Sequence, residues 1–179
     1  SASLVGSEMC IRDRYFPLVG LVIGFLLAAV NYSLFYIETP LFLRVTLLLL
    51  AEIIITGGLM YDGFMDTADG VFSARSRERM LEIMKDSHVG SNAVLAIIIL
   101  LLLKIAAYLE LSGETLTWVL LTMSVATRTF MVVFIVNFPY ARKEGIGHMF
   151  TKYAKPFYTY IAFAVCAGII AACLSLIHI

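Results

Sequence analysis

The sequence predicts an all-α, polytopic membrane helix bundle of about five transmembrane helices, with one short amphipathic helix at the membrane surface. Of the 179 residues, 61% are hydrophobic, whereas a soluble domain is nearer half apolar. The apolar residues are concentrated in runs long enough to cross a bilayer. The formal net charge is zero, so no basic field attracts nucleic acid, and no nucleic-acid partner is expected.

Five apolar stretches define the predicted spans, because a helix needs about 20 mainly apolar residues to cross a bilayer. Glu38-Thr39-Pro40 ends the first stretch, since proline stops a helix. A tight turn at 112–114 separates the third from the fourth. The predicted spans are 16–37, 41–60, 89–111, 115–138 and 156–174. We expect 15–173 to form one truncated membrane domain, and 1–14 and 174–179 to be extensions foreign to the natural gene, the first of them foreign or disordered.

The distribution of basic residues predicts the topology. The connections at 38–40 and 112–114 contain no Lys or Arg. Basic loops remain in the cytoplasm, so both long polar connections should lie on the cytoplasmic face, where a site assembled from them would have to be. Arg44 and Lys104 lie toward the far ends of their spans and are expected to extend to the interface. The basic residues that set this orientation are Arg75, Arg77, Arg79, Lys85, Arg142, Lys143, Lys152 and Lys155.

An acidic segment follows the second span. Asp62, Asp66 and Asp69 are spaced i, i+4, i+7, which on a helix confines them to an arc of roughly 60°. Three like charges on one face repel each other at a membrane boundary where charge is already costly. A bound cation would neutralise them, and an all-oxygen ligand set suits Mg²⁺ or Mn²⁺ better than zinc. The sequence therefore predicts a magnesium or manganese site at these three aspartates, with solvation of a helix end as the alternative.

Two glycines accompany the aspartates. Gly63 and Gly70 leave room for a large ligand to approach the backbone, and they are the candidate substrate-binding residues of this segment. Close packing between helices in lipid is an alternative role for both glycines.

The segment 75–86 predicts a short amphipathic helix on the cytoplasmic surface. Ser76 is a candidate N-cap, with Glu78 in the first turn. Arg75 and Lys85 flank the acidic segment, where a cation beside bound phosphate would stabilise charge on a leaving group. Contact with lipid headgroups is the alternative for most of these arginines. The apolar stripe consists of Met80, Leu81, Ile83 and Met84.

Two further charged residues are candidates. Glu52 lies inside the second span, where an ionisable group is functional by default; protonation, or pairing with Arg128, is the structural alternative. Arg142, in the second polar loop, is a candidate phosphate contact, with a lipid headgroup as the alternative.

Four segments resemble the cobalamin synthase family, the adenosylcobinamide-GDP ribazoletransferases. The first two are the most specific, and the likeness covers about residues 15–173. At Met60, family members usually have His, and they are longer than this chain. The segments are Thr56 to Gly70, Arg75 to Gly90, Tyr15 to Gly24 and Pro139 to Gly147.

This resemblance implies a Mg²⁺-dependent transferase of the last stage of cobalamin biosynthesis, in a bacterial or archaeal cytoplasmic membrane with its active site facing the cytoplasm. The 3′-hydroxyl of α-ribazole, or of its 5′-phosphate, would attack the phosphate linked to adenosylcobinamide, and GMP would leave. Asp62, Asp66 and Asp69 would hold Mg²⁺ on the pyrophosphate. Asp86 would be a ligand or help deprotonate the hydroxyl. A homo-oligomer in the bilayer is compatible with the likeness.

Two other functions fit parts of the pattern. CDP-alcohol phosphotransferases of phospholipid synthesis carry DxxDGxxAR. Asp66, Asp69 and Gly70 match that motif, but Ala74-Arg75 come one residue late. A cation transporter would use Glu52 and the aspartates as an ion path, yet acids would then be expected on several spans.

The topology predicts that 61–88 and 139–155 face the same side. Single cysteines at Ser76 and at Glu144, in a background lacking the native cysteines, should react equally with an impermeant thiol reagent added to one side of the membrane. Opposite reactivity would mean that the number of crossings between the two loops is wrong.

Overall fold

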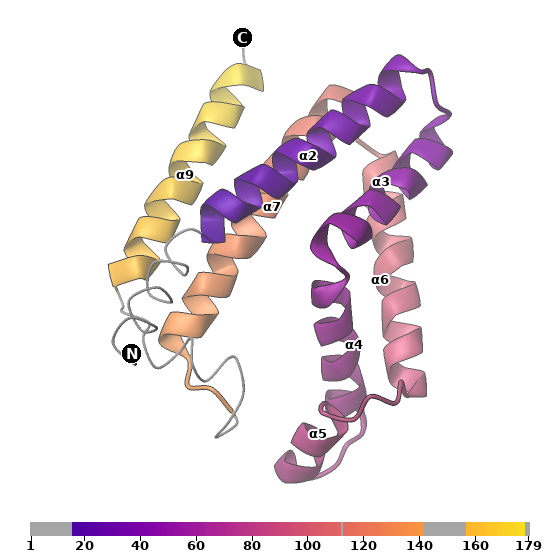
Figure 1. Cartoon of the computed structure of the whole chain (residues 1–179), viewed down its shortest axis with the longest axis vertical. Coiled ribbons are helices and arrows are strands. Elements are labelled where there is room, and N and C mark those ends of the chain that lie inside the picture. The colour runs from indigo at the N-terminus through magenta and orange to yellow at the C-terminus, as the bar shows by residue number, and fades with distance from the viewer. Residues whose placement is uncertain (1–15, 112, 142–156, 178–179) are drawn as a thin grey trace, which may run out of the picture. The chain divides into compact units, whose positions relative to one another are not determined.

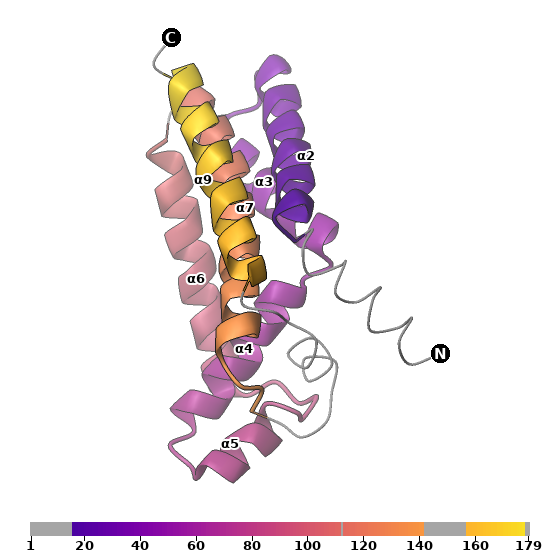
Figure 2. The same cartoon turned by 90° about the vertical axis from the view of Figure 1, so that its left-hand side faces the viewer.

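A computed structural model of the chain describes residues 16–111, 113–141 and 157–177. Every regular element in these ranges is an α-helix, which confirms the all-α prediction. Figure 1 labels the helices, and Figure 2 gives the view turned by 90°. The elements are α2 (Phe16–Tyr36), α3 (Leu41–Thr56), α4 (Leu59–Phe72), α5 (Arg77–Ile83), α6 (Ser91–Leu109), α7 (Gly113–Asn137) and α9 (Phe157–Ile177).

Within the residues that the structure describes, three helices, α2, α6 and α7, are long and apolar enough to cross a membrane, as predicted for the first, third and fourth spans. The fifth predicted span forms helix α9, and its crossing of the membrane stays a prediction. The chain divides into two compact units, one of residues 1–29 with 117–179 and one of residues 30–116. Residues 1–14, predicted to be an extension, lie outside the described residues.

In the first unit, glycines bring the start of α2 against α7. A Cβ atom on Gly20 would lie 2.6 Å from the carbonyl oxygen of Ser124, and one on Gly24 would lie 2.8 Å from Cα of Leu121. Helices in lipid associate through such small residues because close backbone approach maximises van der Waals contact. Helix α9 lies beside α7 in both views (Figures 1 and 2), with an edge-to-face contact between Phe130 and Phe163 at 6.4 Å between ring centroids.

In the second unit, the prediction of one continuous span over 41–60 is wrong. The helix breaks at Gly57-Gly58, whose φ angles are +65° and +71°, and α3 and α4 meet at a bend of 91°. Both glycines adopt the left-handed conformation that residues with a side chain avoid. The Gly57 and Gly58 amides donate to carbonyl oxygens of the last turn of α3 at 3.3 and 3.0 Å, which satisfies the broken helix end. The bent pair α3–α4 therefore counts as at most one span.

Helix α4 packs along α6 and against the short α5, and α5 lies at the end of α4 remote from the bend (Figure 1). Gly70 allows the approach of α5, because a Cβ atom there would lie 2.5 Å from Cε of Met84. The predicted amphipathic helix thus forms, and Met84 at its C-terminal end lies against Gly70 of α4. The predicted N-cap Ser76 holds that position without a side-chain hydrogen bond, and Glu78 lies in the first turn.

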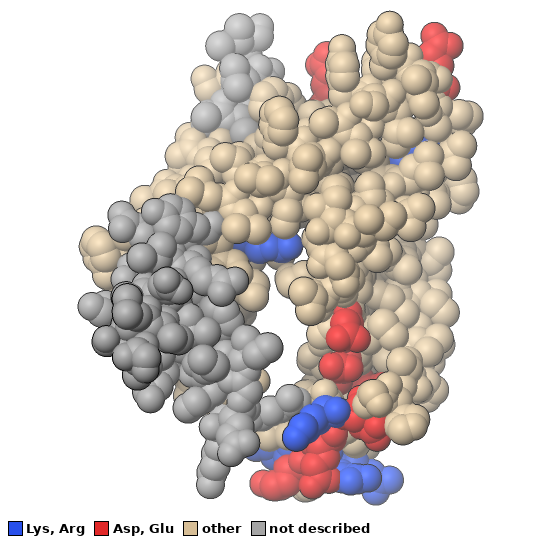
Figure 3. All heavy atoms as spheres, viewed as in Figure 1, with Lys and Arg blue, Asp and Glu red and all other residues tan. Residues whose placement is uncertain are grey.

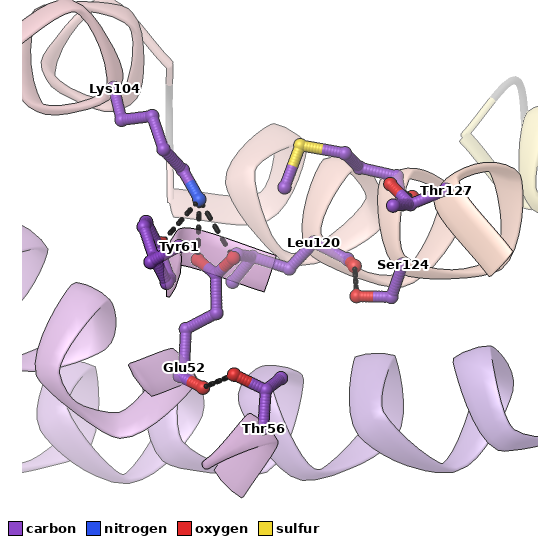
Figure 4. Close-up of polar contacts among 8 residues, drawn as sticks. Glu52, Thr56, Tyr61, Lys104, Leu120, Ser124 and Thr127 are labelled. Atoms are coloured by element: carbon purple, nitrogen blue, oxygen red, sulfur yellow. Dashed lines mark hydrogen bonds and ion pairs between the residues drawn. The ribbon is translucent and has the colours of Figure 1, made fainter. Parts of the chain in front are cut away.

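An ion pair with an added hydrogen bond joins α3, α4 and α6 near the bend between α3 and α4. Lys104 Nζ donates to both carboxylate oxygens of Glu52 at 2.7 Å and to the Tyr61 hydroxyl at 3.0 Å (Figure 4). The Lys104 and Glu52 side chains are only 18% and 17% exposed. The partner of Glu52 is therefore Lys104 in place of the Arg128 considered from the sequence, and Lys104 turns inward instead of extending to the interface.

Arg44 is buried at the turn between α2 and α3, and its position at the membrane interface stays a prediction. The residue is 7% exposed, and its guanidinium carbon lies 5.4 Å from the centroid of the Phe35 ring. The sequence placed both cations near helix ends correctly. It could not show that α2 offers Arg44 a contact inside the protein, or that α3 and α4 do so for Lys104.

We expect Lys104→Met to lower the free energy of unfolding by about 3 kcal/mol or more, because it leaves the Glu52 carboxylate buried and unpaired. Glu52→Gln combined with Lys104→Met should recover most of that loss, since neither buried charge remains. Thermal unfolding in detergent measures the effect. A double variant no more stable than Lys104→Met alone would contradict the pairing.

Candidate active site

The three aspartates of the acidic segment lie on one helix, α4, as predicted. Asp62 is exposed in the first turn, Asp66 is half-buried one turn later, and Asp69 is half-buried near the end of the helix. Acidic side chains follow α4 in Figure 3 and lead to a mixed group of acidic and basic side chains around α5. The carboxylates thus extend from the bend toward the connection between α4 and α6.

Asp69 joins α4 to the start of α6. Its Oδ2 accepts a hydrogen bond from the Gly90 amide at 2.6 Å, and its Oδ1 accepts one from the Ala93 amide at 2.8 Å. The first amides of a helix have no partner within that helix, and a carboxylate beside them is favoured by the helix dipole. Asp69 therefore caps α6 from a neighbouring helix, a role that the sequence analysis missed.

Gly90 makes this capping contact sterically possible. A Cβ atom at residue 90 would lie 2.5 Å from Oδ1 and 2.7 Å from Oδ2 of Asp69, closer than any side chain tolerates. The backbone of Gly90 is extended, with φ of −85°, so the glycine is required for space and not for conformation. The signal in the sequence was Asp69, the third aspartate of the acidic segment, together with Gly90 directly before the apolar run of α6.

The fit of the aspartates to Mg²⁺ differs along the helix. Asp62 and Asp66 offer hard oxygen donors one turn apart, the ligand type that Mg²⁺ takes together with water and phosphate oxygens. Each carboxylate oxygen of Asp69 already accepts a hydrogen bond from a backbone amide. Within the described ranges 16–111, 113–141 and 157–177, no three His, Cys, Asp or Glu side chains form a group that could hold a metal. Metal binding by Asp62 and Asp66 is thus compatible with the donor set, and participation of Asp69 stays a prediction.

The two candidate glycines of α4 have different surroundings. A Cβ atom on Gly63 would have no atom within 4 Å, so the helix backbone between Asp62 and Asp66 is open to a ligand. Gly70 is buried against Met84. Of the two roles left open by the sequence, ligand approach fits Gly63 and helix packing fits Gly70.

The candidate cations lie on the connection between α4 and α6. Arg75 follows Ala74, which has a φ of +51°, and both Arg75 and Lys85 are exposed. Arg79 instead pairs with Glu82 on the surface of α5 at 2.7 Å. Arg142, the candidate from the second polar loop, lies outside the described residues.

Asp86 forms an exposed pair with His88. The His88 Nδ1 lies 2.6 Å from Asp86 Oδ1, and the His88 amide donates to the same oxygen at 3.1 Å. The side-chain hydrogen bond from His88 lowers the pKa of Asp86, and the same hydrogen bond raises the pKa of His88. Asp86 is therefore a well-ionised carboxylate and a weak base. The sequence analysis did not identify His88 as a partner of Asp86; their i, i+2 spacing was the available signal.

Comparisons with known proteins agree on one family. The family model described as cobalamin-5-phosphate synthase matches residues 7–179. Proteins named adenosylcobinamide-GDP ribazoletransferase are 41% identical in Desulfitobacterium hafniense and 42% identical in Clostridium novyi, over 85% and 87% of this chain. The matched regions cover 61% and 62% of those relatives, so the chain spans about three fifths of their length. The relative of that name in Escherichia coli is 41% identical over 75% of this chain and 55% of its own length. No solved structure matches the chain.

The Asp69 cap predicts that Gly90→Ala and Asp69→Ala destabilise the chain to a similar extent, by about 1–2 kcal/mol, the usual effect of losing a helix cap. Because both substitutions remove the same contact, the double variant should be little less stable than either single variant. Thermal unfolding in detergent measures all three.

Gly63→Ala is the matched control for this prediction, since its added methyl group meets no atom and alanine favours a helix interior. It should leave stability unchanged or raise it. Additive losses for Gly90→Ala and Asp69→Ala would show that Asp69 does not act through the start of α6.

Proposed function

Because this chain belongs to the cobalamin-5-phosphate synthase family, we propose that it carries the acidic part of the active site of an adenosylcobinamide-GDP ribazoletransferase. The observation that carries the proposal is the open side of α4, where exposed Asp62 and half-buried Asp66 flank Gly63. A pyrophosphate approaching this surface meets oxygen ligands for a divalent cation and no side chain at the glycine.

In the proposed reaction, the 3′-hydroxyl oxygen of α-ribazole, or of its 5′-phosphate, forms a bond to the phosphorus linked to adenosylcobinamide. The bond from that phosphorus to the oxygen of GMP breaks, GMP leaves with the bonding electrons, and the hydroxyl proton passes to solvent. Most of the catalysis in phosphoryl transfer comes from positioning and charge neutralisation. The protein must therefore supply fixed charges at the pyrophosphate.

Asp62 and Asp66 would hold Mg²⁺, with Asp69 fixing the helix that carries them. When bound, the metal would neutralise the charge on the phosphate oxygens. The exposed cations Arg75 and Lys85 would stabilise charge on the leaving phosphate, as cations aimed at developing charge do. Arg142 is proposed as a further phosphate contact from the second polar loop.

The geometry at Asp86 supports one of its two candidate roles. An efficient general base has a pKa near the working pH, whereas the hydrogen bond from His88 lowers the pKa of Asp86. Asp86 is accordingly proposed as a charged ligand or orienting group and not as the base for the ribazole hydroxyl.

The sidedness of the site follows from the charge pattern. The connection between α4 and α6 carries exposed Arg75, Arg77, Arg79 and Lys85, and such loops remain in the cytoplasm. We therefore place the proposed site on the cytoplasmic face of a cytoplasmic membrane, where a large polar corrinoid can reach it without entering lipid.

The substrate assignment predicts GMP release by membranes that contain a full-length version of the protein, Mg²⁺, adenosylcobinamide-GDP and α-ribazole phosphate. Asp66→Asn, which preserves size and removes charge, should reduce that rate by at least about a hundredfold, as expected for the loss of a metal ligand at a reacting phosphate. Glu78→Gln, an exposed change on α5, is the control and should retain the rate.

A second substrate pair tests the alternative chemistry in the same membranes. CDP-diacylglycerol with a small alcohol should give no CMP. CMP without GMP would reassign the protein to phospholipid synthesis, whereas normal GMP release by Asp66→Asn would remove the carboxylate site itself.

A further inference from the structure

A second polar site lies at the connection between α2 and α3, far along the unit of residues 30–116 from α5 (Figure 1). Arg44 in the first turn of α3 is 7% exposed, and its Nε donates to no acceptor. The guanidinium carbon lies 5.4 Å from the centroid of the Phe35 ring. No carboxylate in the described parts of the chain forms an ion pair with it.

This buried cation requires a counter-ion. Burial of an unpaired charge is strongly unfavourable, and a cation–π contact recovers only about 0.5–2 kcal/mol. A guanidinium presents several N–H donors in a planar fork that matches the oxygens of a phosphate. The Nε–H of Arg44, which has no acceptor in the protein, therefore indicates a phosphate ligand from outside the protein.

Arg44 lines a cavity of about 550 Å³, within the range of about 300–1,000 Å³ typical of small-molecule sites. Aromatic rings form much of its wall, and Glu38 supplies an acid to the same cavity. Glu38 is held at a φ of +56° in the turn between the helices. The lining residues are Tyr32, Phe35, Tyr36, Glu38, Thr39 and Arg44.

The position of the cavity identifies the class of ligand. It lies where two apolar helices meet a polar turn, on the face that the charge pattern places opposite the cytoplasm. Tyrosine and phenylalanine rings at such a boundary contact the glycerol and upper acyl region of lipids. A phosphate that is always present at this depth is that of a membrane phospholipid.

We propose that this cavity binds the headgroup of a zwitterionic aminophospholipid, with its phosphate on Arg44 and its ammonium group on Glu38. One cation and one anion in the cavity match a headgroup that carries one charge of each sign. An anionic phospholipid would leave Glu38 facing added negative charge. The site is separate from the aspartates of α4, and the inference does not depend on the proposed transferase activity.

The test uses the chain purified in detergent and native mass spectrometry after equilibration with phosphatidylethanolamine, phosphatidylglycerol or water-soluble phosphoethanolamine. We expect retention of phosphatidylethanolamine above the other two. Arg44→Gln should weaken that retention roughly tenfold to a hundredfold, the range for one charge-assisted hydrogen bond. Glu38→Gln should remove the preference over phosphatidylglycerol. Arg77→Gln, the same change on exposed α5, is the matched control and should have no effect.

A second measurement needs no variant and so remains valid if Arg44→Gln fails to fold. Phosphatidylethanolamine with a photoreactive group near its glycerol should crosslink to peptides containing residues 32–44 of the unaltered protein. Equal retention by Arg44→Gln, or crosslinks confined to other helices, would overturn the site. Retention of free phosphoethanolamine equal to that of the lipid would overturn the assignment to a membrane lipid.

Discussion

The carboxylate of Asp69 holds two backbone amides at the start of α6, and the geometry of the acidic segment depends on this contact. Without it, two amides of the first turn of α6 would lose their carboxylate partner, and the end of α4 would lose its polar link to that helix. The contact exists only because Gly90 has no side chain. The pattern of a third aspartate followed by a distant glycine thus has a structural cause that is independent of any metal.

The bend at Gly57-Gly58 has an equally direct consequence. A helix that continued from α3 would keep Asp62 on the axis of a membrane span, where a charged side chain is costly. The 91° turn separates the apolar α3 from the acidic α4. The Glu52–Lys104 pair behind the turn links α3 to α6. The bend and this pair together allow four acidic residues to lie within residues 52–69 of a membrane protein. They are Glu52, Asp62, Asp66 and Asp69.

Much of this arrangement could be predicted from the sequence, and the failures have identifiable causes. Long apolar runs locate α2, α6 and α7 because bilayer thickness fixes helix length. The i, i+4, i+7 spacing placed the aspartates on one helix because that relation is local. The bend was missed since hydropathy does not record backbone φ, although the Gly57-Gly58 pair was visible. The partners of Glu52 and Asp69 were missed because they lie 52 and 21 or more residues away in sequence, and only packing brings them together.

The two arginine environments differ in a way that the composition alone cannot show. Arg75 is exposed on the connection between α4 and α5, so water screens its charge and a substrate phosphate can reach it. Arg44 is buried against an aromatic ring with an unfilled donor, so its charge requires a permanent partner. A phosphate bound transiently during turnover satisfies the first environment, whereas a resident lipid phosphate satisfies the second. In these two proposals, arginine would serve chemistry at one face of the bilayer and lipid anchoring at the other, because burial determines how long its counter-ion must stay.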